Sequence, residues 1–168
     1  MSEDVAWYLI YTKPQQEGVA LTNLLQQHFL AYLPMMDSRK RQRGEYRMVT
    51  EPMFPRYVFV QLNRETDNWS VIRSTRGVAN LVRFGLAPAR VPDDFVCMLQ
   101  SREKNELLPK EKEDLFVTGD QVKILDGPFA GMEAVYDVKK PGERAVILLQ
   151  IANNYTRVKL SEHELGKV

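Results

Sequence analysis

The spacing of hydrophobic and polar positions divides the first hundred residues into strands and helices. Aromatic and branched residues fill positions 7–11 (WYLIY), and two sets of side chains alternate over residues 57–62 (YVFVQL), as in strands. Apolar residues recur at helical spacing over 21–29, and helices are also expected over 67–74 and from Pro92 onward. This order of strands and helices predicts an α+β sandwich.

The alternation in residues 57–62 gives the expected strand two apolar faces. Val58, Val60 and Leu62 form one set and are ordinary core residues. Tyr57 and Phe59 lie on the opposite face. Because an exposed aromatic face is unusual in a soluble protein, we expect something to cover these two rings.

A basic run interrupts the hydrophobic pattern between residues 39 and 47. It contains Arg39, Lys40, Arg41, Arg43 and Arg47, and Gly44 breaks it. We expect a hairpin arm that its charge keeps in water. Two interpretations stay open, an arm that tracks DNA and a solvated hairpin tip.

A change of composition after residue 101 marks a linker. Residues 101–114 read SREKNELLPKEKED, which is highly charged and contains Pro109. We therefore expect an N-terminal domain over 1–101, a linker over 102–114 and a second domain over 115–168.

Composition indicates a soluble protein of the cytoplasm. Hydrophobic residues make up 44% of the chain and charged residues 27%, as in globular proteins. The net charge is only +1, so any contact with nucleic acid needs locally clustered basic residues. Cys97, the sole cysteine, excludes an internal disulfide or zinc site. No segment resembles a signal peptide or a membrane span, and no membrane contact is expected.

Catalytic chemistry has little support in the sequence. His28 and His163 are the only histidines. His28 is expected on the apolar face of a helix, as a core or edge residue, and His163 in a solvated tail. No nucleophile elbow, phosphate-binding glycine loop or metal-ligand cluster is recognisable. We expect a binding protein with no metal and no cofactor, and not an enzyme.

Three further segments carry the most information about function. They are EPMFPRYVFVQL (51–62), STRGVANLVRFG (74–85) and GDQVKILDGPFAGMEAVY (119–136), and the last is typical of small β-barrels that bind RNA or proteins. Together with WYLIYTK near the start, they occur in the order found in the NusG family of transcription elongation factors. The chain resembles that family over nearly its whole length, and most closely its specialised RfaH branch.

The resemblance implies an elongation and antitermination factor that suppresses pausing and termination by bacterial RNA polymerase. An N-terminal NusG-type domain would bind the clamp helices of the largest subunit through an apolar patch, and the gate loop of the second subunit through a polar step. The positions that match these polymerase contacts are Tyr11, Phe54, Tyr57, Phe59, Asn68, Trp69 and Ser70.

The resemblance also implies contact with the non-template DNA strand. Lys13 and Arg76 match DNA-binding positions, and both suit phosphate or base-edge contact. The further basic residues of the first helix in RfaH are replaced here by Val19, Asn23 and Gln26. Recognition of the same DNA element is therefore not implied.

For residues 115–168 the resemblance implies a KOW-type domain with two alternative folds. One is a five-stranded β-barrel that recruits a small-subunit ribosomal protein and so couples transcription to translation. The other is an α-helical hairpin that covers the polymerase-binding patch in an autoinhibited monomer.

The residues of this domain suit both folds. Ala134 stands where a barrel would use glycine, and residues 143–151 fit a helix with Val146, Leu149 and Asn153 aligned. Yet residues 146–148 suit a buried strand, and 155–160 alternate like one. Such conflict is what a fold switch requires. We predict the hairpin in the free protein, and the matching interdomain positions are Glu51, Val96, Leu99, Phe129, Met132 and Arg144.

Two other interpretations are weighed against this one. A ribosome-associated RNA-binding KOW protein is the alternative from another class, because the GDQVKILDGPF segment also occurs in ribosomal proteins. If this chain were such a protein, its N-terminal half should be far more basic than it is. The other is a general NusG housekeeping factor, which differs only in degree from an RfaH-like factor. Ala134 and the Glu51–Arg144 pairing argue against it.

Overall fold

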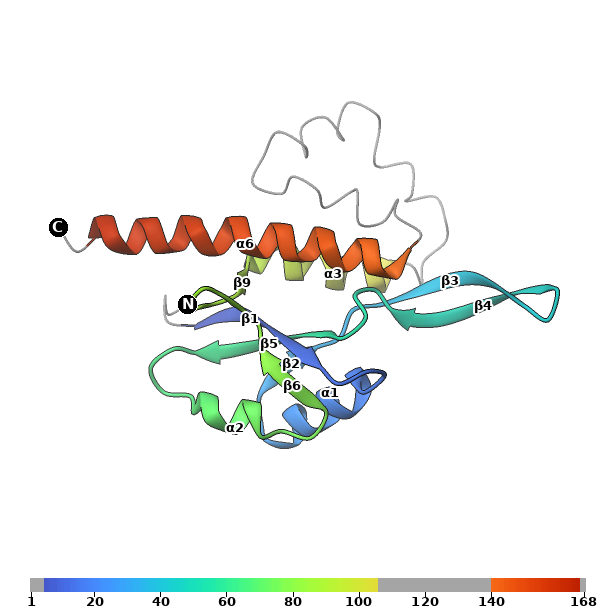
Figure 1. Ribbon diagram of the computed structural model, residues 1–168, viewed down its shortest axis with the longest axis horizontal. Coiled ribbons are helices and arrows are strands. Elements are labelled where there is room, and N and C mark those ends of the chain that lie inside the picture. The colour runs from blue at the N-terminus through green and yellow to red at the C-terminus, as the bar shows by residue number, and fades with distance from the viewer. Residues whose placement is uncertain (1–4, 106–139, 167–168) are drawn as a thin grey trace, which may run out of the picture.

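The computed structural model describes residues 5–105 and 140–166, which are built around one antiparallel sheet. Its strand order is β2 (Leu30–Tyr32), β5 (Tyr57–Asn63), β1 (Val5–Thr12) and β6 (Val78–Leu81), and β9 (Arg90–Val91) also pairs with β1. Helices α1 (Glu17–Gln26) and α2 (Trp69–Arg73) lie on one side of this sheet. Helices α3 (Asp93–Asn105) and α6 (Pro141–Gly166) lie on the other (Figure 1). The expected mixed α/β architecture is confirmed.

The alternation of side chains along β1 and β5 produces two separate cores. Val58, Val60 and Leu62 pack with Ala20 and Leu24 of α1. Phe59 points the other way and joins a second cluster that contains residues of α3 and α6. The aromatic face of β5 is therefore covered, as its pattern requires.

The basic run forms a long hairpin that projects from the sheet (Figure 1). Strands β3 (Met35–Gln42) and β4 (Glu45–Pro52) pair from Met35 and Pro52 to Gln42 and Glu45. The two turn residues, Arg43 and Gly44, have φ of 51° and 80°, the left-handed values that a tight hairpin turn uses. Its side chains from Arg39 to Met48 are exposed. A smaller hairpin pairs β7 (Arg83–Phe84) with β8 (Ala87–Pro88).

One helix end differs from the expected one, and another helix reaches into the expected linker. Helix α1 ends at Gln26, and His28 is an exposed residue with φ of 69°, not part of an apolar helix face. A left-handed residue stops a helix because it turns the chain out of the helical path, here so that Phe29 can return to the core. Helix α3 continues to Asn105, so residues 102–105 of the expected linker are helical. Cys97 is exposed on α3.

Helix α6 replaces both strands considered for this part of the chain. Among its residues up to Leu160, whose side chains the structure describes, the buried ones are Arg144, Leu148, Ala152 and Thr156, one at every fourth position. This face differs from the expected one, because the side chain of Val146 is 55% exposed. Every fourth residue keeps to one side of a helix, whereas position 146 lies half a turn from position 144 and faces solvent. No helix in the described ranges combines the length and apolar character needed to cross a membrane.

Candidate functional site

Three chain segments meet where β1 ends. The Thr12 amide donates a hydrogen bond to the Arg56 carbonyl at 2.8 Å, and the Lys13 amide donates to the Gly77 carbonyl at 2.9 Å. Tyr11 and Tyr57 are paired in the register of β1 and β5. Residues expected to bind polymerase and residues expected to bind DNA therefore lie together. The sheet-end site is defined here as Tyr11, Lys13, Arg56, Tyr57 and Arg76.

Aromatic and cationic groups are stacked within the sheet-end site. The rings of Tyr11 and Tyr57 lie 5.3 Å apart at 50°, and the Arg56 guanidinium carbon is 4.1 Å from the centre of the Tyr11 ring. Arg56 Nε also donates to the Thr12 carbonyl at 3.0 Å, which fixes the guanidinium over the ring. Such a cation–π contact preorganises the surface for binding. Sequence reasoning missed Arg56, although it directly precedes Tyr57.

The environment of Tyr57 keeps its hydroxyl protonated. Burial raises the pKa of Tyr57, the neighbouring Tyr11 raises it further, and the charge of Arg56 opposes both. The net direction is upward from a value that already lies far above neutral. The phenol is therefore a neutral group that can donate as well as accept a hydrogen bond.

The four aromatic residues expected in the polymerase patch differ in exposure. Tyr57 and Phe59 share one strand face, as expected, but only Tyr11 and Tyr57 are partly exposed. Phe54 and Phe59 are fully buried, with ring centres 6.1 Å apart, and both contact Phe95 of α3 at 6.5 and 6.3 Å. The part of the expected patch that reaches the surface therefore consists of the two tyrosines.

Gly77 places Arg76 beside Lys13. Its φ is 90°, a conformation that favours glycine, and a Cβ at this position would lie 2.7 Å from the amide nitrogen of Ala20. The loop therefore packs directly on the first turn of α1. Lys13 and Arg76 are both exposed at the resulting edge.

The expected polar step forms the start of α2. Asn68 Oδ1 accepts hydrogen bonds from the Ser70 amide at 3.1 Å and the Ser70 hydroxyl at 2.6 Å, which caps the helix. The ring of Trp69 meets Tyr8 edge to face at 4.8 Å. These residues thus have structural contacts of their own, while Asn68 and Ser70 remain exposed.

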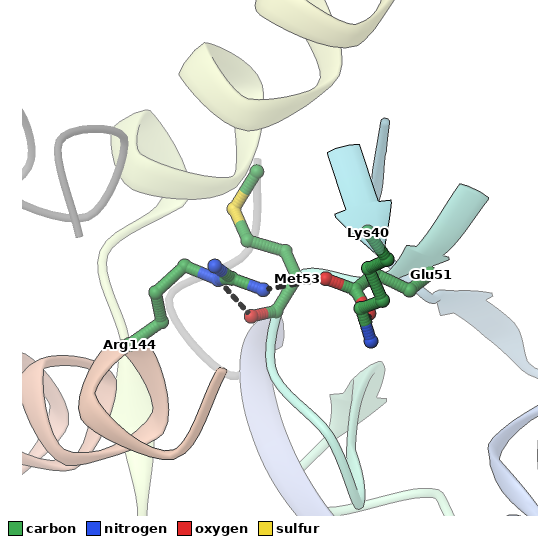
Figure 2. Close-up of polar contacts among 4 residues, drawn as sticks. All are labelled: Lys40, Glu51, Met53 and Arg144. Carbon is green, nitrogen blue, oxygen red and sulfur yellow. Dashed lines mark hydrogen bonds and ion pairs between the residues drawn. The ribbon is translucent and has the colours of Figure 1, made fainter. Parts of the chain in front are cut away.

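A buried arginine connects α6 to the base of the long hairpin. Arg144 Nε donates to the Met53 carbonyl at 2.7 Å, and its Nη2 lies 3.4 Å from Glu51 Oε1. The second carboxylate oxygen of Glu51 is 2.5 Å from Lys40 Nζ. Figure 2 shows the carboxylate between these two cations. Lys40 was not expected in this role.

The two cations keep Glu51 ionised. Burial acts to raise its pKa, but the hydrogen bond and charge of Lys40 lower it, as do a hydrogen bond with Ser38 and the charge of Arg144. The net direction is downward. Glu51 is therefore an anion at neutral pH and can hold both partners.

Apolar contacts complete the junction between α6 and the rest of the protein. Val96 and Leu99 of α3 are buried in the same cluster as Leu148 and Ala152 of α6. The Arg90 amide donates to the Thr156 hydroxyl at 2.9 Å further along the helix. Phe129 and Met132, also expected at this junction, lie outside the described residues.

Together, these features define a class of protein. The sheet-end site consists of tyrosines and cations, and no three His, Cys, Asp or Glu side chains within residues 5–105 and 140–166 lie close enough to hold a metal ion. This arrangement suits a protein that recognises a charged macromolecular surface. The apolar face of its sheet is covered by its own helix α6.

Comparison with known proteins gives the family. The model of the family described as "Transcription termination factor nusG" matches residues 5–100, more than half of the chain, and the chain therefore belongs to the NusG family.

Individual relatives agree in name. Proteins of Staphylococcus carnosus (26% identical, 100% of both chains) and Thermus thermophilus (27% identical, 97% of this chain and 98% of that one) are named "Transcription termination/antitermination protein NusG". The protein of that name from Streptomyces galbus is 26% identical, and the match covers 96% of this chain but 59% of the relative. The chain thus spans about three-fifths of that relative's length. A solved structure, "Domain interaction in Thermotoga maritima NusG", is 21% identical with a TM-score of 0.41 over 55% of this chain and 53% of that one.

Proposed function

We propose that this protein is a transcription elongation and antitermination factor that binds bacterial RNA polymerase and suppresses pausing and termination. Family membership supports this function, since the relatives are named termination/antitermination proteins. The observation that carries it is the sheet-end site, in which a partly exposed tyrosine pair adjoins exposed Lys13 and Arg76. The relatives favour this function over a ribosome-associated protein.

Each part of the surface suits one element of a transcription complex. Tyr11 and Tyr57 offer large, rigid rings of the kind that anchor protein interfaces, here to the clamp helices of the largest subunit. Lys13, Arg56 and Arg76 offer cations to the phosphates of the non-template strand. Asn68 and Ser70, on the exposed first turn of α2, would meet the gate loop of the second subunit.

We further propose that α6 holds the free protein in a closed state, as in the RfaH branch. Leu148 and Ala152 belong to the cluster that contains Phe54 and Phe59, so α6 shares the apolar face that the polymerase would need. Arg144 ties the helix to Glu51 and Met53. On release, the C-terminal domain would adopt a KOW barrel and bind a small-subunit ribosomal protein.

A pause assay with purified polymerase tests the docking surface. Leu148→Asp puts a charge in the junction of α6 and should release the helix, so this variant should shorten pauses at lower concentration than the wild type. Adding Tyr57→Ala should abolish that gain. Tyr46→Ala is the matched control, because Tyr46 is an exposed tyrosine on the hairpin, outside the sheet-end site. Unchanged activity of the Tyr57→Ala variant would remove the proposed patch.

A further inference from the structure

A cavity of about 510 Å³ lies between α6 and the sheet, separate from the sheet-end site. Its aromatic lining residues are Tyr8, Trp69 and Phe84, and Leu86, which also lines it, is 93% exposed. Its cations are Arg64, Arg90 and Lys159. Trp69 is the one lining residue that the expected polymerase contacts include.

The lining of this cavity combines aromatic rings with positive charge. Among the residues that the structure describes, three basic side chains line it and no Asp or Glu does. The Trp69 ring is held edge to face against Tyr8 at 4.8 Å, which fixes its orientation. The volume lies within the range of about 300–1,000 Å³ that is usual for small-molecule sites. The favoured ligand is therefore anionic at one end and flat and unsaturated at the other.

Arg90 supplies a second, independent observation. Its Nε is buried and has no hydrogen-bond partner among the described residues. The guanidinium carbon lies 5.9 Å from the ring centre of Tyr155 on α6, so the head group sits at the junction of helix and sheet. A buried donor without an acceptor is costly, and a shift of the Arg90 side chain toward an anion bound in the cavity would relieve that cost.

We propose that this cavity binds a nucleoside phosphate. The base would stack against Trp69, and the phosphate would accept hydrogen bonds from Arg64, Arg90 and Lys159. Arg64 and Arg90 come from the sheet domain and Lys159 from α6, so the ligand bridges the two and stabilises their contact. Binding of this ligand does not depend on the proposed polymerase function.

Calorimetric titration of the full chain with AMP and GMP tests the site. We expect at least one of them to bind, and adenosine or pyrophosphate alone to bind at least about tenfold more weakly, because each lacks half of the recognised chemistry. Lys159→Ala should weaken nucleotide binding about tenfold, the loss of one charge-assisted hydrogen bond. Arg157→Ala is the matched control, since Arg157 is exposed on the same helix and does not line the cavity.

Three results would overturn the proposal. One is that neither mononucleotide binds at about 5 mM, because any affinity would then be weaker than that of a specific small-molecule site. Another is an equal loss of affinity in the Lys159→Ala and Arg157→Ala variants, which would indicate non-specific attraction to a basic helix. The third is a single-stranded tetranucleotide that binds where neither mononucleotide does. Thermal unfolding of both variants verifies that they are folded.

Discussion

Arg144 of α6 and Glu51 of β4 lie 3.4 Å apart although 93 positions separate them in the chain. The pair is not isolated. Arg144 also donates to the Met53 carbonyl, and Glu51 also binds Lys40. Removing Arg144 takes a partner from both the Met53 carbonyl and Glu51, although Glu51 keeps Lys40. Removing Glu51 leaves Arg144 its hydrogen bond to the Met53 carbonyl.

Replacing Arg144 should loosen α6 more than replacing Glu51. We expect Arg144→Ala to cost about 3 kcal/mol of helix docking, since it removes a buried side chain together with its polar contacts to Met53 and Glu51. Glu51→Gln should cost about 1 kcal/mol, because the amide oxygen can still accept from Arg144. Hydrogen exchange of the α6 amides measures both. Equal losses would mean that the Met53 contact contributes nothing.

Acid should destabilise the folded protein through Glu51. The folded pKa of Glu51 is lowered, so the unfolded state takes up its proton first. The contribution of Glu51 is complete at neutral pH and is lost as the pH falls below about 4.3, the ordinary glutamate value, through the lower folded pKa. Denaturant unfolding of the wild type at a series of pH values should show this loss of stability. The Glu51→Gln variant should lack this component.

Gly77 should tolerate substitution less well than another glycine of similar conformation. Gly77→Ala would place a methyl group 2.7 Å from the backbone of Ala20, and we expect a loss of about 3 kcal/mol or more of stability. Gly44 has φ of 80° but open space around it, so Gly44→Ala should cost only about 1 kcal/mol. Denaturant unfolding of the two variants gives the comparison. Similar losses would show that backbone conformation alone, and not the contact with α1, selects glycine.

The buried face of α6 can be verified residue by residue. Leu148→Ala should weaken the docking of α6 by about 2–4 kcal/mol, because it leaves a cavity at a fully buried position. Val146→Ala, two residues earlier and 55% exposed, should change it by less than about 0.5 kcal/mol. Hydrogen exchange of α6 again reports the difference. A larger effect at Val146 would mean that the helix docks through its other face.

The proposed fold switch predicts that the C-terminal segment depends on the rest of the chain. Isolated residues 113–168 should give a strand-rich circular dichroism spectrum, and the same segment within the full chain a helical contribution. The sheet domain would then be what stabilises α6. The same strand-rich spectrum in both contexts would rule out the switch.

Much of the sheet domain was predictable because its signals are local. The period-two alternation of residues 57–62 predicts β5 and assigns each side chain to its face. The run of basic residues around Gly44 predicts the projecting hairpin. The end of α1 was misplaced because apolar spacing continues to Phe29, and only the left-handed His28 ends the helix earlier.

The interactions around the candidate site residues were harder to predict from the sequence. The motifs led to Tyr11, Tyr57, Lys13 and Arg76, but not to Arg56, whose guanidinium is positioned by the Thr12 carbonyl and the Tyr11 ring. They also led to Glu51 and Arg144, but not to Lys40, which lies on β3 and forms an ion pair with Glu51 on β4. The register of β1 and β5 brings Arg56 to Tyr11 and Thr12, which are far from it in the chain. Lys40 reaches Glu51 across the hairpin from four positions beyond Met36, the register partner of Glu51.

By itself, the sequence determined the two-faced sheet, the basic hairpin and the set of motifs that the NusG family shares, because each depends on residues close together. It left residues 146–148 and 155–160 equally suited to strand and helix. Only the tertiary structure decided for the helix and for its Arg144–Leu148–Ala152 face. The physical reason is that marginal local propensity is outweighed by burial against an apolar surface and by a carboxylate contributed from about ninety residues away.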